Sequence, residues 1–118
     1  MTNVKDRYEF IEEMFEKLGR ISVEQIVGRY TKLIPRGRHW MGLCPFHRDT
    51  KLWSFIVTPD KCMWKCFSCG DEYAGNGVKF VSLYKNITYL EAAFEIAYEF
   101  GLITYDEYRR YYRRKYDE

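Results

Sequence analysis

Hydrophobic residues recur at helical spacing near the beginning of the chain. Over residues 5–18 apolar side chains return every three or four positions with acidic residues between them, which predicts an amphipathic helix that ends near Gly19. Ser22 is followed three positions later by Gln25, as in a capping box, and apolar residues come after the serine. This pattern predicts a short second helix.

Helical spacing returns in the last third of the chain. One amphipathic segment begins after Gly77, and a second begins at Thr88, where Glu91 completes a capping box. Thr104 and Glu107 form a third capping box, which predicts a terminal helix. The tyrosines expected on one face of that helix are Tyr105, Tyr108, Tyr112 and Tyr116.

The middle of the chain has a different pattern, with short β-branched and aromatic runs separated by Gly and Pro. We predict strands at residues 31–34, 39–43, 54–58 and 62–65. Tight turns are expected at residues 35–37 and 59–61, because proline presets the first turn dihedral angle. The predicted fold class is therefore α+β, with a small antiparallel sheet flanked by N-terminal and C-terminal helices.

Two ligand pairs with a spacing of two residues follow predicted strands in this sheet. They are Cys44 with His47, and Cys66 with Cys69. Such a spacing lets one tight turn aim two side chains at one ion, and four protein ligands fill a tetrahedral site. The sequence thus predicts one structural Zn²⁺. Cys62 is interpreted as a small strand residue, with replacement of one ligand as the alternative.

Composition narrows the class of protein further. No apolar run approaches the roughly 20 residues of a membrane-spanning helix, and the N-terminal residues do not resemble a secretory signal. We therefore expect a cytoplasmic protein without a membrane partner, in a compartment where thiols stay reduced and available to metal. A net charge of +2 is too small to identify a polyanionic partner, but aromatic residues make up 19% of the chain. Aromatic rings beside Arg and Lys are typical of single-stranded nucleic-acid binders, although they also fill small cores.

Residues 21–102 resemble the zinc-binding domain of bacterial DnaG-type DNA primases. The resemblance rests on GRHWMGLCPFH at residues 37–47, SFIVTPDK at 54–61 and WKCFSCG at 64–70, with shorter matches at 26–30 and 75–80. In that family the Cys, His, Cys, Cys set holds zinc in a zinc-ribbon sheet, and the domain helps to recognise the single-stranded template. The implied division is an N-terminal helix at 1–20, the zinc-binding domain at 21–102 and a basic, tyrosine-rich helix at 103–118. Residues 71–74 lengthen the turn after the second ligand pair relative to the family.

The resemblance and the clustering of basic residues give a set of candidate DNA contacts. They are Arg36, Arg38, Trp40, Phe55, Lys61, Trp64 and Lys65. Alternate residues of a flat sheet project from one face, where rings stack on bases and cations meet phosphates. The sequence of a single strand does not reveal which face is buried. Phe55 and one of the tryptophans could therefore equally face the core instead of the DNA. His39 is expected on an exposed strand.

The leading hypothesis is a single-stranded DNA-binding module of primase type that acts with a separate polymerase, primase or helicase. We expect no enzymatic activity of its own, since the catalytic primase domain is not in this sequence, and a phage or another mobile element as its source. The alternative is a protein-interaction adapter that docks through the terminal helix, without affinity for DNA. That helix carries Arg109, Arg110, Arg113, Arg114 and Lys115 beside its tyrosines. Binding to DNA, docking on a partner and packing on the domain all stay open for it.

Overall fold

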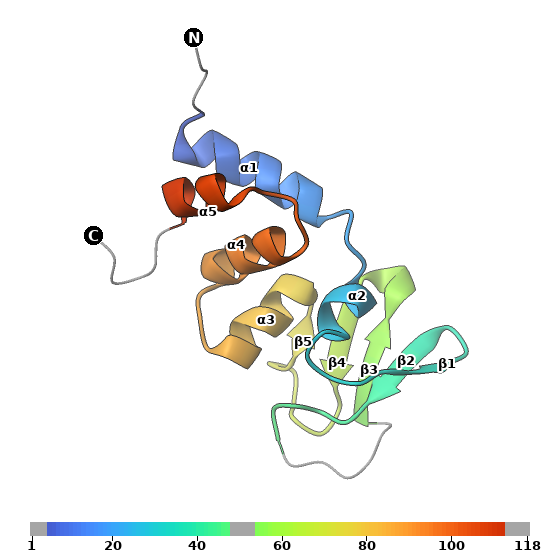
Figure 1. Ribbon diagram of the computed structural model, residues 1–118. Coiled ribbons are helices and arrows are strands. Elements are labelled where there is room, and N and C mark those ends of the chain that lie inside the picture. The colour runs from blue at the N-terminus through green and yellow to red at the C-terminus, as the bar shows by residue number, and fades with distance from the viewer. Residues whose placement is uncertain (1–4, 48–53, 113–118) are drawn as a thin grey trace.

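A five-stranded antiparallel sheet and five helices make up the computed structural model, which describes residues 5–47 and 54–112 (Figure 1). The strands follow the order β1-β2-β3-β4-β5 across the sheet. Their bounds are Ile34–Arg36, His39–Gly42, Phe55–Thr58, Met63–Cys66 and Ala74–Gly75. The helices are α1 (Arg7–Leu18), α2 (Val23–Val27), α3 (Gly77–Lys85), α4 (Tyr89–Glu99) and α5 (Tyr105–Tyr111). The predicted α+β class is confirmed. Within the described part of the chain no helix is long and apolar enough to cross a membrane.

The register of the sheet divides its residues between two faces. Val57 of β3 lies opposite Trp40 of β2 and Trp64 of β4, so all three side chains point to the same side. Phe55 in turn pairs with Cys66 and points to that side as well. This inner sheet face packs against α2 and α3, and Phe80 of α3 is fully buried there. The core of the domain therefore begins on the inner sheet face.

The core continues from the sheet into the helices at both ends of the sequence. Phe10 of α1 stacks on Tyr111 of α5 with ring centroids 4.0 Å apart. Arg7 Nε donates a hydrogen bond to the Tyr111 carbonyl at 2.9 Å, and the Tyr111 hydroxyl donates to the Lys5 carbonyl at 2.7 Å. Figure 1 shows α1 and α5 side by side, next to α4. The three segments predicted from the sequence, at residues 1–20, 21–102 and 103–118, thus contribute to one hydrophobic cluster.

Capping patterns in the sequence correspond to the observed helix starts. The Thr88 backbone N–H donates to Glu91, and the Glu91 N–H donates to the Thr88 hydroxyl at 3.1 Å. Thr104 and Glu107 make the same reciprocal pair at α5. The Ser22 backbone N–H donates to Gln25 Oε1 at 3.1 Å. The three predicted capping boxes are confirmed.

Three local predictions in the sheet and its turns are wrong. The first strand starts at Ile34 rather than at residue 31, because the Thr31 N–H still bonds to Val27 at the end of α2. The first hairpin turns at residues 37–38, so Arg36 belongs to β1. Cys62 is not in a strand: it has φ 53° and closes the turn over Pro59–Lys61 just before β4.

The prediction for the face of the last helix also needs correction. The predicted tyrosine set omitted Tyr111, which is the buried residue of α5. Tyr108 packs on Tyr98 of α4, with ring centroids 5.0 Å apart, and it stacks on Tyr112 at 4.6 Å. Tyr116 lies outside the described residues, as do Arg113, Arg114 and Lys115. The described tyrosines thus pack the helix against the domain.

Candidate metal centre

Side chains from two separate turns meet at one end of the sheet. The Sγ atoms of Cys44, Cys66 and Cys69 and a ring nitrogen of His47 all lie within 4.8 Å of one another. Cys44 Sγ is 3.6 Å from Cys69 Sγ, and His47 Nδ1 is 3.8 Å from Cys66 Sγ. Two ligands of a tetrahedral zinc ion are about 3.5–3.8 Å apart, so these separations fit one ion. His47 Nδ1 and Cys69 Sγ are 2.7 Å apart, which is closer than two ligands of one tetrahedral zinc ion.

Backbone hydrogen bonds hold the second ligand turn in place on the sheet. Cys66 is the last residue of β4, and its N–H donates to the Tyr73 carbonyl at 2.9 Å. The next N–H, that of Phe67, donates to the Ser54 carbonyl at 2.7 Å, which ties this turn to the start of β3. Gly70 follows the last ligand with φ 104°, a backbone conformation that side-chain-bearing residues rarely adopt. The second ligand pair is thus fixed by the sheet itself.

The turn that carries the first ligand pair packs on a cluster of aromatic side chains. Phe46 lies between Cys44 and His47 in sequence, and its ring centroid is 5.5 Å from that of Trp64 and 5.3 Å from that of Phe80. Since both partners are buried core residues, the turn that carries these two ligands rests on the main core. The metal centre and the core are therefore expected to stabilise each other.

The donor set needs a cation. Burial raises the pKa of the Cys44 thiol, and the neighbouring thiols of Cys66 and Cys69 raise it further, against a hydrogen bond from the Phe46 N–H. Several thiolates cannot share so small a space without a compensating positive charge. Zn²⁺ supplies that charge, and three sulfur ligands with one imidazole are a usual structural zinc set. The four residues hold one zinc ion. Because they fill all four positions of a tetrahedral site, no position is left for a water molecule or a substrate.

The fold and this donor set define the class: a zinc ribbon in which the metal stabilises a small antiparallel sheet. The family model of the CHC2 zinc finger of DnaG-type primases matches residues 7–112. The chain belongs to this family.

Individual relatives and a solved structure agree with this assignment. The chain is 42% identical over 81 residues to a DNA primase of Aquifex aeolicus and 37% identical over 111 residues to a DNA primase of Clostridium acetobutylicum. These alignments cover 69% and 91% of this chain, but only 16% and 18% of the relatives. A crystal structure of the Aquifex aeolicus primase, comprising its zinc-binding and RNA polymerase domains, matches with a TM-score of 0.66 and 38% identity. It is matched over 82% of this chain and 24% of that one.

The structure corrects the predicted DNA contacts at two aromatic positions. Phe55 is 0% exposed and Trp64 is 1% exposed, because the register places both on the inner sheet face. The Trp64 indole N–H donates to the Asn76 carbonyl at 2.7 Å, so its one polar group is also used inside. Neither ring is available for stacking on a base. Trp40 is half-buried, beside Glu24 and Lys32 at the edge of α2.

The basic candidates lie at accessible positions. Arg36, Arg38 and Lys61 are exposed, and Lys65 is half-buried on the side of the sheet away from α2 and α3. The ammonium nitrogen of Lys65 is 5.1 Å from the ring centroid of Phe67 and 3.6 Å from a carboxylate oxygen of Asp71. These four cations remain predictions as DNA contacts.

One exposed aromatic residue was missed in the sequence. Phe67 sits between Cys66 and Cys69, and it is 62% exposed. Its position between two ligands was not a sufficient sign, because Phe46 lies at the corresponding place in the first ligand pair and packs on the core. The exposed ring lies next to Lys65, whereas the rings of the sheet residues Phe55 and Trp64 are buried.

Proposed function

We propose that this chain is a single-stranded DNA-binding zinc module of primase type that works together with a separate replication polymerase, primase or helicase. Membership of the CHC2 zinc finger family supports a role in primase-dependent replication. The chain spans less than a fifth of the length of the curated relatives it matches. Those relatives are DNA primases and much longer proteins, and the role proposed for this chain is recognition of the template without catalysis.

The observation that supports DNA binding best is the face of the sheet that no helix covers in the described part of the chain. Lys65 pairs with Ile56, and Ile56 pairs with Met41, so these side chains project opposite to the core. We call this the outer sheet face. Its residues, all exposed or half-buried, are Ile34, Arg36, His39, Met41, Ile56, Thr58, Met63 and Lys65. The alternation that buries Trp64 presents Lys65 to solvent.

A shallow hollow on the outer sheet face joins its apolar and charged groups. It measures about 180 Å³, and its lining includes Ile56, Met63, Lys61, Lys65 and Phe67. Phe67 supplies a flat ring for an unpaired base, while the two lysines lie within the same hollow and meet the backbone phosphates. Such a combination favours single strands, because the bases of a duplex are stacked inside and do not reach a ring on a shallow surface.

Fluorescence anisotropy with a labelled 20-nucleotide single strand and the zinc-loaded chain tests this proposal. If Arg36, Arg38, Lys61 and Lys65 all neutralise phosphates, the logarithm of affinity falls with the logarithm of salt with a slope of about −2.8. Raising salt from about 50 to 200 mM then weakens binding about 50-fold. Phe67→Ala is expected to weaken binding about tenfold, as loss of one stacked base does.

A matched control separates local from general charge effects. Lys65→Ala should reduce the salt slope by about 0.7. Lys17→Ala, at an exposed position near the end of α1, should leave both affinity and slope unchanged. Absence of binding by the zinc-loaded chain, or equal losses for the Lys17 and Lys65 variants, would reject the outer sheet face as the DNA site.

A further inference from the structure

An apolar strip runs along α1 beside the part of the helix that faces the core. The core side of the helix carries Phe10, Met14 and Leu18. Tyr8, Ile11 and Phe15 follow one another at steps of three and four residues, so they form a second line on an adjoining face. Tyr8 is 76% exposed, and the other two side chains are half-buried. We call these three residues the α1 strip.

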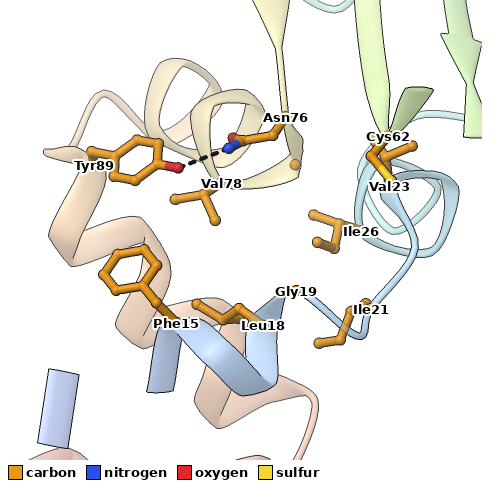
Figure 2. A pocket seen from close by; sticks show the side chains of 11 residues that line it. Phe15, Leu18, Gly19, Ile21, Val23, Ile26, Cys62, Asn76, Val78 and Tyr89 are labelled. Atoms are coloured by element: carbon orange, nitrogen blue, oxygen red, sulfur yellow. Dashed lines mark hydrogen bonds between the residues drawn. The ribbon is translucent and has the colours of Figure 1, made fainter. Parts of the chain in front are cut away.

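The α1 strip leads into a pocket between four elements of the fold. Phe15 lines both the groove along α1 and this pocket, which has a volume of about 260 Å³ (Figure 2). Figure 2 shows Phe15 and Leu18 on one side, Val78 and Tyr89 on another, and Ile26 with Cys62 across from them. The remaining lining is Gly19, Ile21, Val23, Asn76 and Gly77. The wall is apolar apart from Cys62 and the Asn76–Tyr89 hydrogen bond of 2.8 Å.

Acidic side chains border the α1 strip on the side away from the core. Glu9, Glu12, Glu13 and Glu16 line the same groove as Tyr8, Ile11 and Phe15. Lys5 forms an ion pair with Glu13. Among the described residues, none forms an ion pair with Glu12 or Glu16, and both are exposed. The groove therefore combines an apolar floor with a negative border.

We propose that this groove binds a basic amphipathic helix of a partner protein. The apolar side chains of such a helix would cover the α1 strip and enter the pocket, and its Lys and Arg residues would meet Glu12 and Glu16. From Tyr8 to Phe15 the strip extends about 10 Å along α1, which is two turns and matches anchors spaced i, i+3, i+4 and i+7. The negative border repels nucleic acid, so a protein is the fitting occupant.

This docking surface is separate from the DNA surface proposed above. Cys62, in the pocket wall, precedes β4, whereas Cys66 at the metal centre ends it, so the pocket and the zinc site lie at opposite ends of that strand. The pocket lies among α1, α2, α3 and α4, and of these helices α2 and α3 pack against the inner sheet face. Binding of a helix here thus leaves the outer sheet face free, and failure of one proposal does not affect the other.

Titration calorimetry with the zinc-loaded chain and a synthetic 18-residue helical peptide provides the test. The probe carries Leu at i, i+3, i+4 and i+7, Lys at the positions that flank this apolar face and Ala elsewhere, so that repulsion between like charges does not unfold the helix. A second peptide has Glu in place of every Lys, and a third has the same composition with the Leu positions scrambled. We expect binding of the first peptide only. Tyr8→Ala is expected to weaken it about tenfold, as loss of an exposed aromatic anchor does, and the double variant Glu12→Lys, Glu16→Lys at least as much.

Control measurements make the outcomes distinct. Glu72→Lys changes an exposed glutamate in the turn after the second ligand pair and should leave the affinity within twofold. Bound peptide should also slow the reaction of Cys62 with iodoacetamide, since that thiol lies in the pocket wall. Equal binding of all three peptides, or indifference to both groove variants, would refute the proposal. Self-association that is lost in Tyr8→Ala would instead assign the groove to a second copy of this chain.

Discussion

Replacement of Trp64 by alanine tests the division of the sheet into two faces. The indole is 1% exposed, and its ring centroid lies 5.8 Å from that of Phe55 and 5.4 Å from that of Phe80. Truncation of a buried tryptophan to alanine costs about 3–5 kcal/mol of folding free energy. The Asn76 carbonyl, which accepts from the indole N–H at 2.7 Å, keeps its second donor, the Phe80 N–H at 3.1 Å, so loss of the indole hydrogen bond adds at most about 1 kcal/mol.

Those costs are large against the whole stability of a small domain. A typical native domain is stable by about 5–15 kcal/mol, so Trp64→Ala is expected to remove a major part of that free energy. Urea denaturation followed by circular dichroism measures it as a lower midpoint with zinc present. Trp64→Phe keeps a ring in the core but loses the N–H, and its midpoint should lie between wild type and Trp64→Ala.

The DNA affinity of the same variants completes the test. Any loss of binding in Trp64→Ala should follow the unfolded fraction and disappear under conditions where the variant is folded. Phe67→Ala should behave in the opposite way, with stability within about 0.5 kcal/mol of wild type, as is usual for a surface change, and weaker DNA binding. If Trp64→Ala keeps the wild-type urea midpoint but loses DNA affinity, Trp64 is on the accessible face and the register described here is wrong.

Three further predictions concern the metal, the terminal helix and pH. Cys66→Ser, or chelation of the metal, should remove stabilisation on the order of 10 kcal/mol and unfold the sheet, seen as loss of the near-ultraviolet aromatic signal; a chain that stays folded without metal would contradict a structural role. Tyr111→Ala should speed hydrogen exchange in α1 and α5 more than in the sheet, because that ring joins the two helices; uniform exchange would argue against this. Burial alone would lower the pKa of Lys85, but the hydrogen bond to Glu95 at 2.7 Å and the nearby negative charges raise it above the ordinary value. Since a raised pKa stabilises the fold below the unfolded-state value near 10.4, the stability difference between wild type and Lys85→Met should be constant from about pH 7 to 9 and shrink above about pH 10.4.

The zinc ligands and the helix caps could be predicted because they depend on short-range patterns. Cys66 and Cys69 have two residues between them in one turn, and Thr88 reaches Glu91 within one helical turn. In both cases the chemistry involves neighbours in sequence, so the spacing alone identifies the partners. The convergence of two ligand pairs on one ion followed from the same reasoning, since four suitable ligands in matched pairs leave few other arrangements.

The faces of the strands could not be predicted from alternation. Phe55 and Ile56 are adjacent and both apolar, as are Met63 and Trp64, so both faces of the sheet read as hydrophobic in the sequence. Only the packing of α2 and α3 against one side decides which of each pair is buried. The contact of α1 with α5 could not be predicted from local sequence patterns either. Phe10 and Tyr111 are separated by most of the length of the chain, and the local sequence around either residue does not identify the other as its partner.

The amino-acid sequence alone was enough to predict the metal centre, the α+β class and most helix starts, because each depends on residues within one turn or one element. The tertiary structure decided which aromatic rings form the core and which remain at the surface. It also decided that Cys62 and Phe15 of α1 line one pocket. Those outcomes depend on the burial of apolar area between distant segments, a quantity that exists only once the chain has packed.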